Sequence, residues 1–290
     1  MNLEIRLGKE PEKALDVLRV LASPLDYSIH EIEDRRIDSE VKPTPVRLNP
    51  ENFVLLEAAK RGNYEYPDLM VSMYNLATGH IGDLPTKLDF IPKDTSKTSD
   101  GIPYIGMINH QQANDLVIGA GYYPLNLRLF ADFLRMVREG AYENKDVFDA
   151  KGQKIKSERL RFIDEEITKV RSPYRGRWVS DKYEEREDGV YVSFYVMRNI
   201  VDEGLDEGTL MEDRIPGINM DSWIKNPVNQ GNPNKKVTGG SLYYWMPGGG
   251  AVARFGADSD RAYLVCDWNP QFSFASLGVQ FCAKGARFEN

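Results

Sequence analysis

Two neighbouring stretches near the C-terminus constrain the fold most, because small or apolar residues recur in them at every second position. These residues are Phe255, Ala257 and Ser259 in the first stretch and Ala262, Leu264 and Cys266 in the second. Successive side chains of a β-strand point to opposite faces of a sheet, so this period of two predicts two strands that each bury one face. Asp260-Arg261 stands between them, where a turn would lie. The pattern predicts an antiparallel pair in a C-terminal sheet.

The opposite face of these two strands has an unusual composition. Its residues are Arg254, Gly256 and Asp258 on the first strand and Tyr263, Val265 and Asp267 on the second. A solvated strand face usually carries Thr, Lys and Glu, whereas this face mixes a cation, a glycine, anions, an aromatic ring and a valine. We therefore expect the outward face to serve a purpose other than solubility.

A loop with three aromatic residues follows, and Leu277–Cys282 is typical of a final strand. The loop carries Trp268, Phe272 and Phe274. Exposed aromatic side chains offer a large contact area at a low entropic cost, as in the binding surfaces of antibodies. Two simpler interpretations stand beside this one: Phe272 and Phe274 pack beneath the loop, and Trp268 fills a buried pocket.

The rest of the chain predicts a mixed α+β fold, with helices early and strands late. Predicted helices cover Ala14–Leu21, Phe53–Ala59, the segments that follow Asn109 and Asn126, Ser157–Val170 and Asn219–Ile224. Predicted strands cover Tyr66–Leu76 and a hairpin of Trp178–Glu187 with Val190–Met197 around Asp188-Gly189. Polar residues with Gly and Pro predict loops over Thr78–Pro103 and Asn226–Lys236.

Composition excludes several classes of protein. The net charge of -7 argues against a nucleic-acid partner, which needs clustered cations. No run of about 18 apolar residues is present, so we expect no membrane-spanning helix. Glu10, Glu12 and Asp16 interrupt the first amphipathic segment, which therefore does not resemble a secretory signal, and we expect synthesis in the cytoplasm. Cys266 and Cys282 are too few for a disulfide framework, and either two buried thiols or one bridge between neighbouring strands fits the sequence.

The C-terminal pattern resembles the variable proteins of diversity-generating retroelements, in particular those of archaea and archaeal viruses. The matching residues are Val252-Ala253, Phe255, Ala257, Ser259, Ala262, Leu264 and Cys266, then Pro270, Ser273 and Ser276-Leu277-Gly278-Val279. Weaker likeness lies upstream, in Gln112-Ala113-Asn114, Gly121–Asn126, Phe130–Leu134 and Gly239–Trp245. The resemblance implies a C-type lectin fold of the formylglycine-generating-enzyme type, with a helical extension over residues 1–60, the lectin-like domain over 61–290 and a variable region over about 250–282.

In this family an error-prone reverse transcriptase randomises adenines, chiefly in Asn codons, which can never become Lys, Glu, Met, Gln or Trp. No Lys, Glu or Met occurs between Met246 and Lys284, whereas Trp268, Gln271 and Gln280 belong to the fixed framework by this criterion. The predicted ligand-binding residues all belong to the accessible set and are Arg254, Gly256, Asp258, Asp260, Arg261, Tyr263, Val265, Asp267, Asn269, Phe272, Phe274 and Ala275. Among them we expect Tyr263, Phe272, Phe274 and Arg254 to anchor the ligand, and Asp258 and Asp267 to set its charge.

The resemblance implies a ligand-binding display protein rather than an enzyme, with a protein or glycan of a cell surface as its partner and a virion or cell surface as its place of display. The alternatives are a formylglycine-generating-enzyme-like oxidoreductase and a structural virion component. The oxidoreductase needs a reactive cysteine pair, and no base stands beside either cysteine in the sequence. Its iron-dependent relatives use a His-x-x-x-His-x-Glu motif, which the separated His30, His80 and His110 do not form.

We expect neither a cofactor nor a catalytic metal. Asp213 and Asp221 are candidates for a structural calcium site, although they lack the dense spacing of oxygen ligands that such a site requires.

Overall fold

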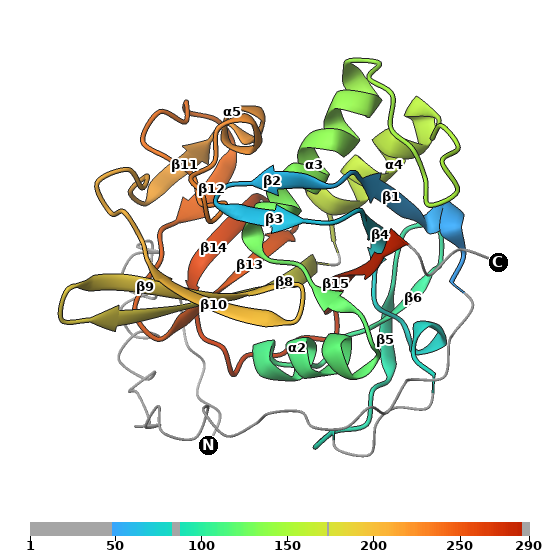
Figure 1. Ribbon diagram of the computed structural model, residues 1–290, viewed down its shortest axis with the longest axis horizontal. Helices are drawn as coiled ribbons and strands as arrows, with labels where there is room; N and C mark the ends of the chain where they lie inside the picture. The colour runs from blue at the N-terminus through green and yellow to red at the C-terminus, as the bar shows by residue number, and fades with distance from the viewer. Residues whose placement is uncertain (1–47, 83–87, 173, 286–290) are drawn as a thin grey trace, which may run out of the picture. The chain divides into compact units, whose positions relative to one another are not determined.

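The predicted C-terminal strands lie in the middle of an 11-stranded sheet in a computed structural model that describes residues 48–82, 88–172 and 174–285 (Figure 1). Along its main path the strands follow the order β1-β4-β15-β8-β13-β14-β12-β11, with β9 and β10 continuing from β8 and β7 pairing with β15. The strands of this sheet are β1 (Phe53–Leu56), β4 (Leu69–Asn75), β7 (Tyr123–Pro124), β8 (Arg175–Arg186), β9 (Gly189–Val196), β10 (Asn199–Gly204), β11 (Arg214–Ile218), β12 (Leu242–Trp245), β13 (Ala251–Ala257), β14 (Ala262–Trp268) and β15 (Leu277–Lys284).

Short hairpins and helices complete the described part of the chain. The hairpin strands are β2 (Ala59–Arg61) with β3 (Tyr64–Tyr66), and β5 (Asp94–Lys97) with β6 (Pro103–Ile105). The helices are α2 (His110–Gly119), α3 (Leu127–Tyr142), α4 (Ser157–Thr168), α5 (Met220–Lys225) and two 3-10 turns, η2 (Pro50–Asn52) and η3 (Thr78–His80). The fold is therefore mixed α+β, as predicted. None of the described helices is long and apolar enough to span a bilayer.

The sequence signals for the longer helices are confirmed. Asn109 caps α2, where it accepts a hydrogen bond from Gln112 N at 2.9 Å, and Gln112 Oε1 accepts one from Asn109 N. Asn126 caps α3 in the same way through Leu129 N. Apolar residues of α3 and α4 pack in one buried cluster with the sheet, and these are Phe130, Phe133, Leu134, Val137, Leu160, Ile163 and Ile167. A second cluster lies between α2 and the strands β8 and β15.

The helix predicted over Phe53–Ala59 is wrong. Phe53–Leu56 is strand β1, which pairs antiparallel with β4 from Phe53 opposite Ser72 to Leu56 opposite Leu69. A four-residue apolar run fits a buried strand and a buried helix segment equally well, and the partner strand decides between them. The sheet domain accordingly begins before residue 61. The helix predicted over Ala14–Leu21 lies outside the described residues.

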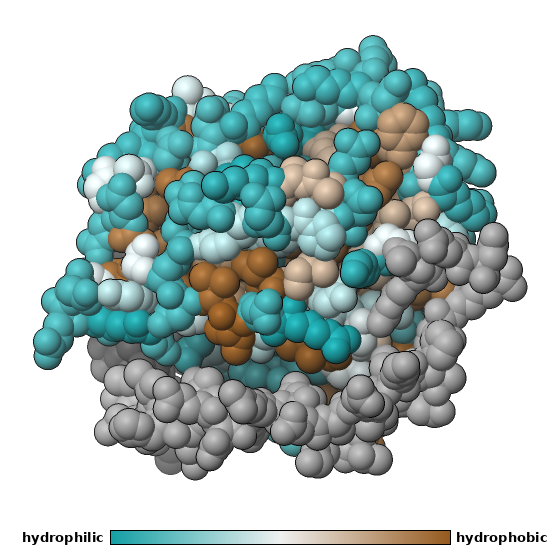
Figure 2. Space-filling model, in the orientation of Figure 1, coloured by the Kyte–Doolittle hydropathy of each residue, from teal (hydrophilic) through white to brown (hydrophobic). Residues whose placement is uncertain are grey.

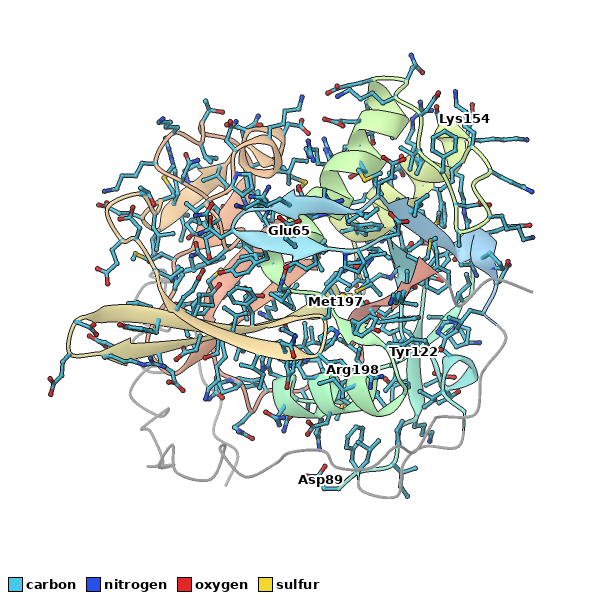
Figure 3. All side chains as sticks on the ribbon, viewed as in Figure 1. Glu65, Asp89, Tyr122, Lys154, Met197 and Arg198 are labelled. Atoms are coloured by element: carbon cyan, nitrogen blue, oxygen red, sulfur yellow. The ribbon has the colours of Figure 1, made fainter. Side chains whose placement is uncertain are left out.

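The predicted hairpin of β8 and β9 is confirmed, with its turn one residue earlier than expected. Arg186 pairs with Gly189, so Glu187 and Asp188 make the turn. The chain then continues into β10, and β11 follows, two strands that the sequence did not reveal. Figure 3 shows Met197 and Arg198 at the turn between β9 and β10, where the Arg198 guanidinium lies 5.7 Å from the centre of the Tyr123 ring. The face drawn in Figure 2 is largely hydrophilic, with an apolar patch near this hairpin.

Gly140 lies inside α3, where the side chains of Val147 and of Leu160 on α4 approach it closely. A Cβ atom at Gly140 would lie 2.7 Å from Val147 Cγ2 and closer still to Leu160 Cδ1. We expect Gly140→Ala to destabilise the fold by about 1–2 kcal/mol despite alanine's better helix propensity, because overpacking a tight core outweighs that gain. Chemical denaturation measures this change. Gly79→Ala is the matched control, since a Cβ there meets nothing within 4 Å and stability should stay within about 0.5 kcal/mol.

Candidate ligand-binding surface

The inward residues of β13 and β14 occupy the main core as predicted, except at the turn. Phe255, Leu264 and Cys266 are fully buried, and Ala257 and Ala262 lie in the same cluster. Ser259, predicted to point inward, is exposed because β13 ends at Ala257. The alternation thus holds along both strands and stops where the turn begins.

The outward residues of the two strands share one face and oppose each other directly. Arg254 pairs with Val265, and Gly256 pairs with Tyr263. An irregularity between Val252 and Arg254 shifts the register, so Val252 opposes Trp268. The bulge brings Trp268 level with the outward face, next to Arg254. The Arg254 guanidinium carbon lies 3.4 Å from the centre of the Trp268 ring.

The expectation that this whole face is open to solvent is wrong at its centre. Arg254 is 5% exposed and Tyr263 is 8% exposed, and Gly256 and Val265 are buried as well. The Tyr174 ring covers this centre, because a Cβ at Gly256 would lie 2.8 Å from Tyr174 Cε2. The other predicted positions are exposed or half-buried and are Asp258, Asp260, Arg261, Asp267, Asn269, Phe272, Phe274 and Ala275. Arg254 and Tyr263 are thus not open anchors in the state described.

Seven aromatic rings form a continuous belt across this face. The aromatic belt consists of Tyr174, Tyr243, Trp245, Tyr263, Trp268, Phe272 and Phe274. Neighbouring ring centres are 5.4–6.4 Å apart, from Trp268–Phe272 to Trp245–Tyr263. Arg261 extends the belt, with its guanidinium 4.6 Å from the centre of the Tyr243 ring. Tyr and Trp with Arg are the side chains that dominate binding hot spots.

Sequence reasoning missed three belt residues, namely Tyr174, Tyr243 and Trp245. Tyr243 and Trp245 alternate with the buried Leu242 and Tyr244 along β12, a period-two signal that could have placed them on one face. Their position beside the variable strands follows from the parallel pairing of β12 with β14, which opposes Tyr243 to Tyr263. This pairing passes over the intervening strand β13, and the alternation within each strand does not reveal it.

The loop after β14 is anchored to the rest of the fold through its backbone, while the side chain of Asn269 accepts a hydrogen bond from Gln271 N at 2.8 Å within the loop. Carbonyl oxygens of the loop accept hydrogen bonds from neighbouring segments: Pro270 O from His110 N at 3.1 Å and Phe274 O from Met107 N at 2.8 Å. Ala275 O accepts from Thr95 Oγ1 at 2.7 Å. Because every residue type has a carbonyl oxygen, these bonds survive any substitution in the loop. The side chains of Phe272 and Phe274 take no part in them, and both rings are exposed rather than packed beneath the loop.

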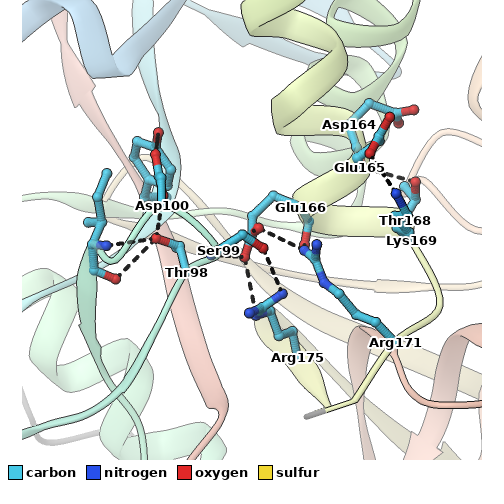
Figure 4. A network of polar contacts seen from close by, with 12 residues as sticks. Thr98, Ser99, Asp100, Asp164, Glu165, Glu166, Thr168, Lys169, Arg171 and Arg175 are labelled. Atoms are coloured by element: carbon cyan, nitrogen blue, oxygen red, sulfur yellow. Dashed lines mark hydrogen bonds and ion pairs between the residues drawn. The ribbon is translucent and has the colours of Figure 1, made fainter.

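Tyr174 reaches the face from a segment that an ion-pair network fixes (Figure 4). Glu166, at the end of α4, is almost buried and pairs with Arg171 at 2.7 Å and with Arg175 at 3.2 Å, on either side of Tyr174. Arg171 N also donates to Asp258 O at 2.7 Å, which ties the segment to the turn between β13 and β14. Buried charges are tolerated when they are paired in this way. The network holds the Tyr174 ring against the variable strands.

The two cysteines show no feature of a reactive pair. Both are free and buried, and burial raises the pKa of each thiol, which disfavours the nucleophilic thiolate. Cys266 lies on β14 and Cys282 on β15, and two strands separate β14 from β15 in the sheet. The bridge between neighbouring strands is therefore excluded. Asn232 Nδ2 lies 3.5 Å from Cys266 Sγ, and Cys282 Sγ lies 3.4 Å from Tyr123 O.

The other candidate residues have structural partners. His110 is buried at the start of α2 with Nε2 2.8 Å from Val179 O, and burial lowers its pKa to about 4. Asp221 pairs with Arg138 at 2.7 Å, and Asp213 accepts a hydrogen bond from Met246 N. Within residues 48–82, 88–172 and 174–285, no three His, Cys, Asp or Glu side chains group as metal ligands would. His30 lies outside the described residues.

Comparison with known proteins adds no identity: no protein-family model, no curated protein and no solved structure matches this chain.

Proposed function

We propose that this chain is a ligand-binding display protein whose C-terminal face recognises a protein or glycan on a cell surface. The observation that carries the proposal is the loop of residues 269–275, whose backbone is fixed from outside while its side chains project. Such a loop keeps these backbone anchors whatever side chains it carries. Selection can then vary the contact surface without loss of the scaffold, since exposed substitutions usually change stability by no more than about 0.5 kcal/mol.

The resemblance to variable proteins of diversity-generating retroelements supports the same function. It supplies a C-type-lectin-like scaffold, a reason for the mixed composition of the outward face, and display on a virion or cell surface. The oxidoreductase alternative loses support from the two thiols, which are buried and lie on β14 and β15, with two strands between them in the sheet. The exposed part of the aromatic belt, together with Arg261 and the carboxylates of Asp258 and Asp267, provides the apolar and charged contacts that recognition requires.

A display library tests the proposal. We expect randomisation of the exposed variable positions to leave most variants folded, and panning against a purified test protein such as lysozyme to yield binders. The randomised positions are Asp260, Arg261, Asp267, Asn269, Phe272, Phe274 and Ala275. Melting temperatures of random library members should stay within a few degrees of the parent, because these side chains are exposed or half-buried. The hydrogen bonds that anchor the loop to neighbouring segments are accepted by carbonyl oxygens.

A four-position library on an unrelated surface is the control, and it is matched by a library that randomises only four loop positions, Asn269, Phe272, Phe274 and Ala275. Strand β10 offers exposed positions at Asn199, Ile200, Asp202 and Gly204, away from the aromatic belt. Fewer binders should emerge from that surface. Equal yields from these two libraries, or general unfolding of the loop library, would count against a built display site.

The genome supplies an independent test of the proposed diversification. We expect a second copy of the segment around codons 250–282 near this gene, differing chiefly at adenines, with a reverse transcriptase gene beside it. A complete genomic neighbourhood without such a copy would contradict diversification by a retroelement and leave the display function to the library result.

A further inference from the structure

We propose that Arg254 and Trp268 together form a receptor for a carboxylate on the ligand, and that this carboxylate belongs to a protein segment with an apolar side chain next to it. The inference rests on the proposed display function and specifies the chemistry of the ligand. It starts from two buried hydrogen-bond donors that meet in the aromatic belt without an acceptor.

Arg254 is buried, and no acidic side chain among the described residues forms an ion pair with it. Its guanidinium lies 3.4 Å from the centre of the Trp268 ring and 5.2 Å from that of Tyr263. Its one hydrogen bond within the described part of the chain runs from Nη1 to Tyr174 Oη at 3.2 Å, and Nε has no acceptor. By contrast, Arg138 pairs with Asp164 and Asp221. A desolvated guanidinium normally has such a partner, so the place of the anion on Arg254 is left to a ligand.

Trp268 supplies the second donor. Its indole Nε1 is buried and also lacks an acceptor among the described residues. Indole nitrogen is a donor only, and a buried indole N–H usually finds an acceptor. Because the guanidinium lies against the indole ring, one small oxygen-bearing group at the edge of this stack can accept from both residues. Two donors in one stack that find no acceptor among the described residues point to an acceptor on the ligand.

A carboxylate fits this pair better than a neutral acceptor. The guanidinium is a planar fork of donors that matches a carboxylate in shape and charge, and charge-assisted bonds are about twice as strong as neutral ones. The aromatic surroundings exclude water and so strengthen the attraction. The Phe272 ring, half exposed and 5.4 Å from the Trp268 ring, can turn aside to admit the group, as interface side chains commonly do.

The surroundings favour a protein segment over an acidic glycan. Phe272 and Phe274 are 48% and 39% exposed, and Met107, which is 56% exposed, donates its backbone N–H to Phe274 O. Covering these apolar side chains releases free energy only if the partner also presents apolar surface. A peptide with an acidic residue beside an aromatic or aliphatic one offers both groups. A glycan offers the carboxylate without the apolar side chains.

The two residues also differ in origin. Arg254 belongs to the set that adenine mutagenesis can reach, whereas Trp268 does not. The indole therefore belongs to the framework, and the preference for a carboxylate belongs to this variant, carried by the side chain at position 254.

The test uses the full chain and small probes. We expect N-acetyl-phenylalanine, which joins a carboxylate to an apolar ring, to shift the nuclear magnetic resonance signals of the Trp268 indole N–H and the Arg254 Nε–H in a saturable manner. N-acetyl-phenylalaninamide should bind about tenfold more weakly, because it lacks the charge and the paired oxygens. Glucuronate, an acidic sugar, should also bind about tenfold more weakly, since it leaves Phe272 and Phe274 uncovered.

Variants test whether the planar guanidinium of Arg254 is the group that binds the carboxylate. Arg254→Lys keeps the charge and loses the planar fork, so we expect about a tenfold loss of affinity for N-acetyl-phenylalanine. Arg186→Lys is the matched control outside the binding face, because Arg186 already pairs with Asp202 and Glu184, and the affinity of this variant should stay within about twofold of the parent. Should Arg254→Lys fail to fold, the comparison of acid with amide on the parent protein still decides the question.

Three results would overturn the inference: equal binding of acid and amide, binding of glucuronate as tight as that of N-acetyl-phenylalanine, or no shift of either signal. The first would show that the carboxylate is not recognised. The second would assign the site to a glycan. The third would show that Arg254 and Trp268 bind no ligand. In each case binders from the display library would keep the proposed function standing. A library that does not fold or yields no binders would refute that function separately.

Discussion

Replacing Phe255 with alanine is expected to lower the free energy of unfolding by about 3–5 kcal/mol, the largest effect of any single change on the variable strands. The ring is fully buried between Phe130, at 5.3 Å, and Trp223, at 6.4 Å between ring centres. Truncation loses the apolar contact and leaves a cavity that helix α3 and the sheet cannot close. Denaturant unfolding of the parent and the variant measures the difference.

Phe274→Ala is the matched control, since it removes a phenylalanine ring from the exposed surface instead of from the core. Phe274 is 39% exposed and its backbone carbonyl, not its ring, holds the loop. We expect its loss to cost less than about 1 kcal/mol. Similar losses for the two phenylalanines would show that the protein does not separate a fixed core from a variable surface, and the proposed display function would lose its physical basis.

The sequence predicts which residues of β13 and β14 belong to the core, because this assignment depends on local periodicity. Alternation along β13 and β14 identifies Phe255 and Leu264 as inward, and a strand has only two faces on which to place its residues. Caps such as Asn126 likewise depend on hydrogen bonds within one turn of the helix that follows. Features of this kind are fixed within a few residues, so the chain displays them directly.

The covered centre of the outward face could not be predicted in the same way. Tyr174 comes to Gly256 from the segment after α4, and these two residues lie 82 positions apart in the chain. Trp268 reaches Arg254 through a register shift that no local pattern announces. Alternation predicts the face of the sheet to which a side chain points, but it does not predict which other segment covers that face. The helix expected over Phe53–Ala59 fails for the same reason, since only the partner strand β4 makes that segment extended.

The second large effect is expected at Asp181, whose carboxyl group is buried in the core. Asp181 Oδ2 accepts a hydrogen bond from Leu127 N at 2.7 Å, whereas Oδ1 has no partner among the described residues. Burial raises the pKa of Asp181 to about 8, against about 3.9 in an unfolded chain. Between these two values the folded protein holds a proton that the unfolded chain has released. Stability therefore falls as pH rises through this window, by up to roughly 5 kcal/mol in all.

Asp181→Asn removes this titration and keeps an oxygen that can accept from Leu127 N. We expect the variant to be more stable than the parent by several kcal/mol near pH 8, and the advantage to vanish below about pH 4. Denaturant unfolding of both proteins at a series of pH values measures it. The comparison cancels the effect of His110, whose lowered pKa destabilises both proteins equally as pH falls below about 6.5.

Asp132→Asn is the control with the opposite sign. Asp132 is as deeply buried as Asp181, but it pairs with Arg128 at 3.1 Å, Arg135 at 3.3 Å and Arg61 at 3.5 Å. Neutralising it leaves the guanidinium groups without their anion, so this variant should lose about 3 kcal/mol at neutral pH. Burial alone cannot produce both outcomes. If the two variants responded alike, the ionic partners would not be what distinguishes these carboxylates, and the same reasoning could not assign a missing anion to Arg254.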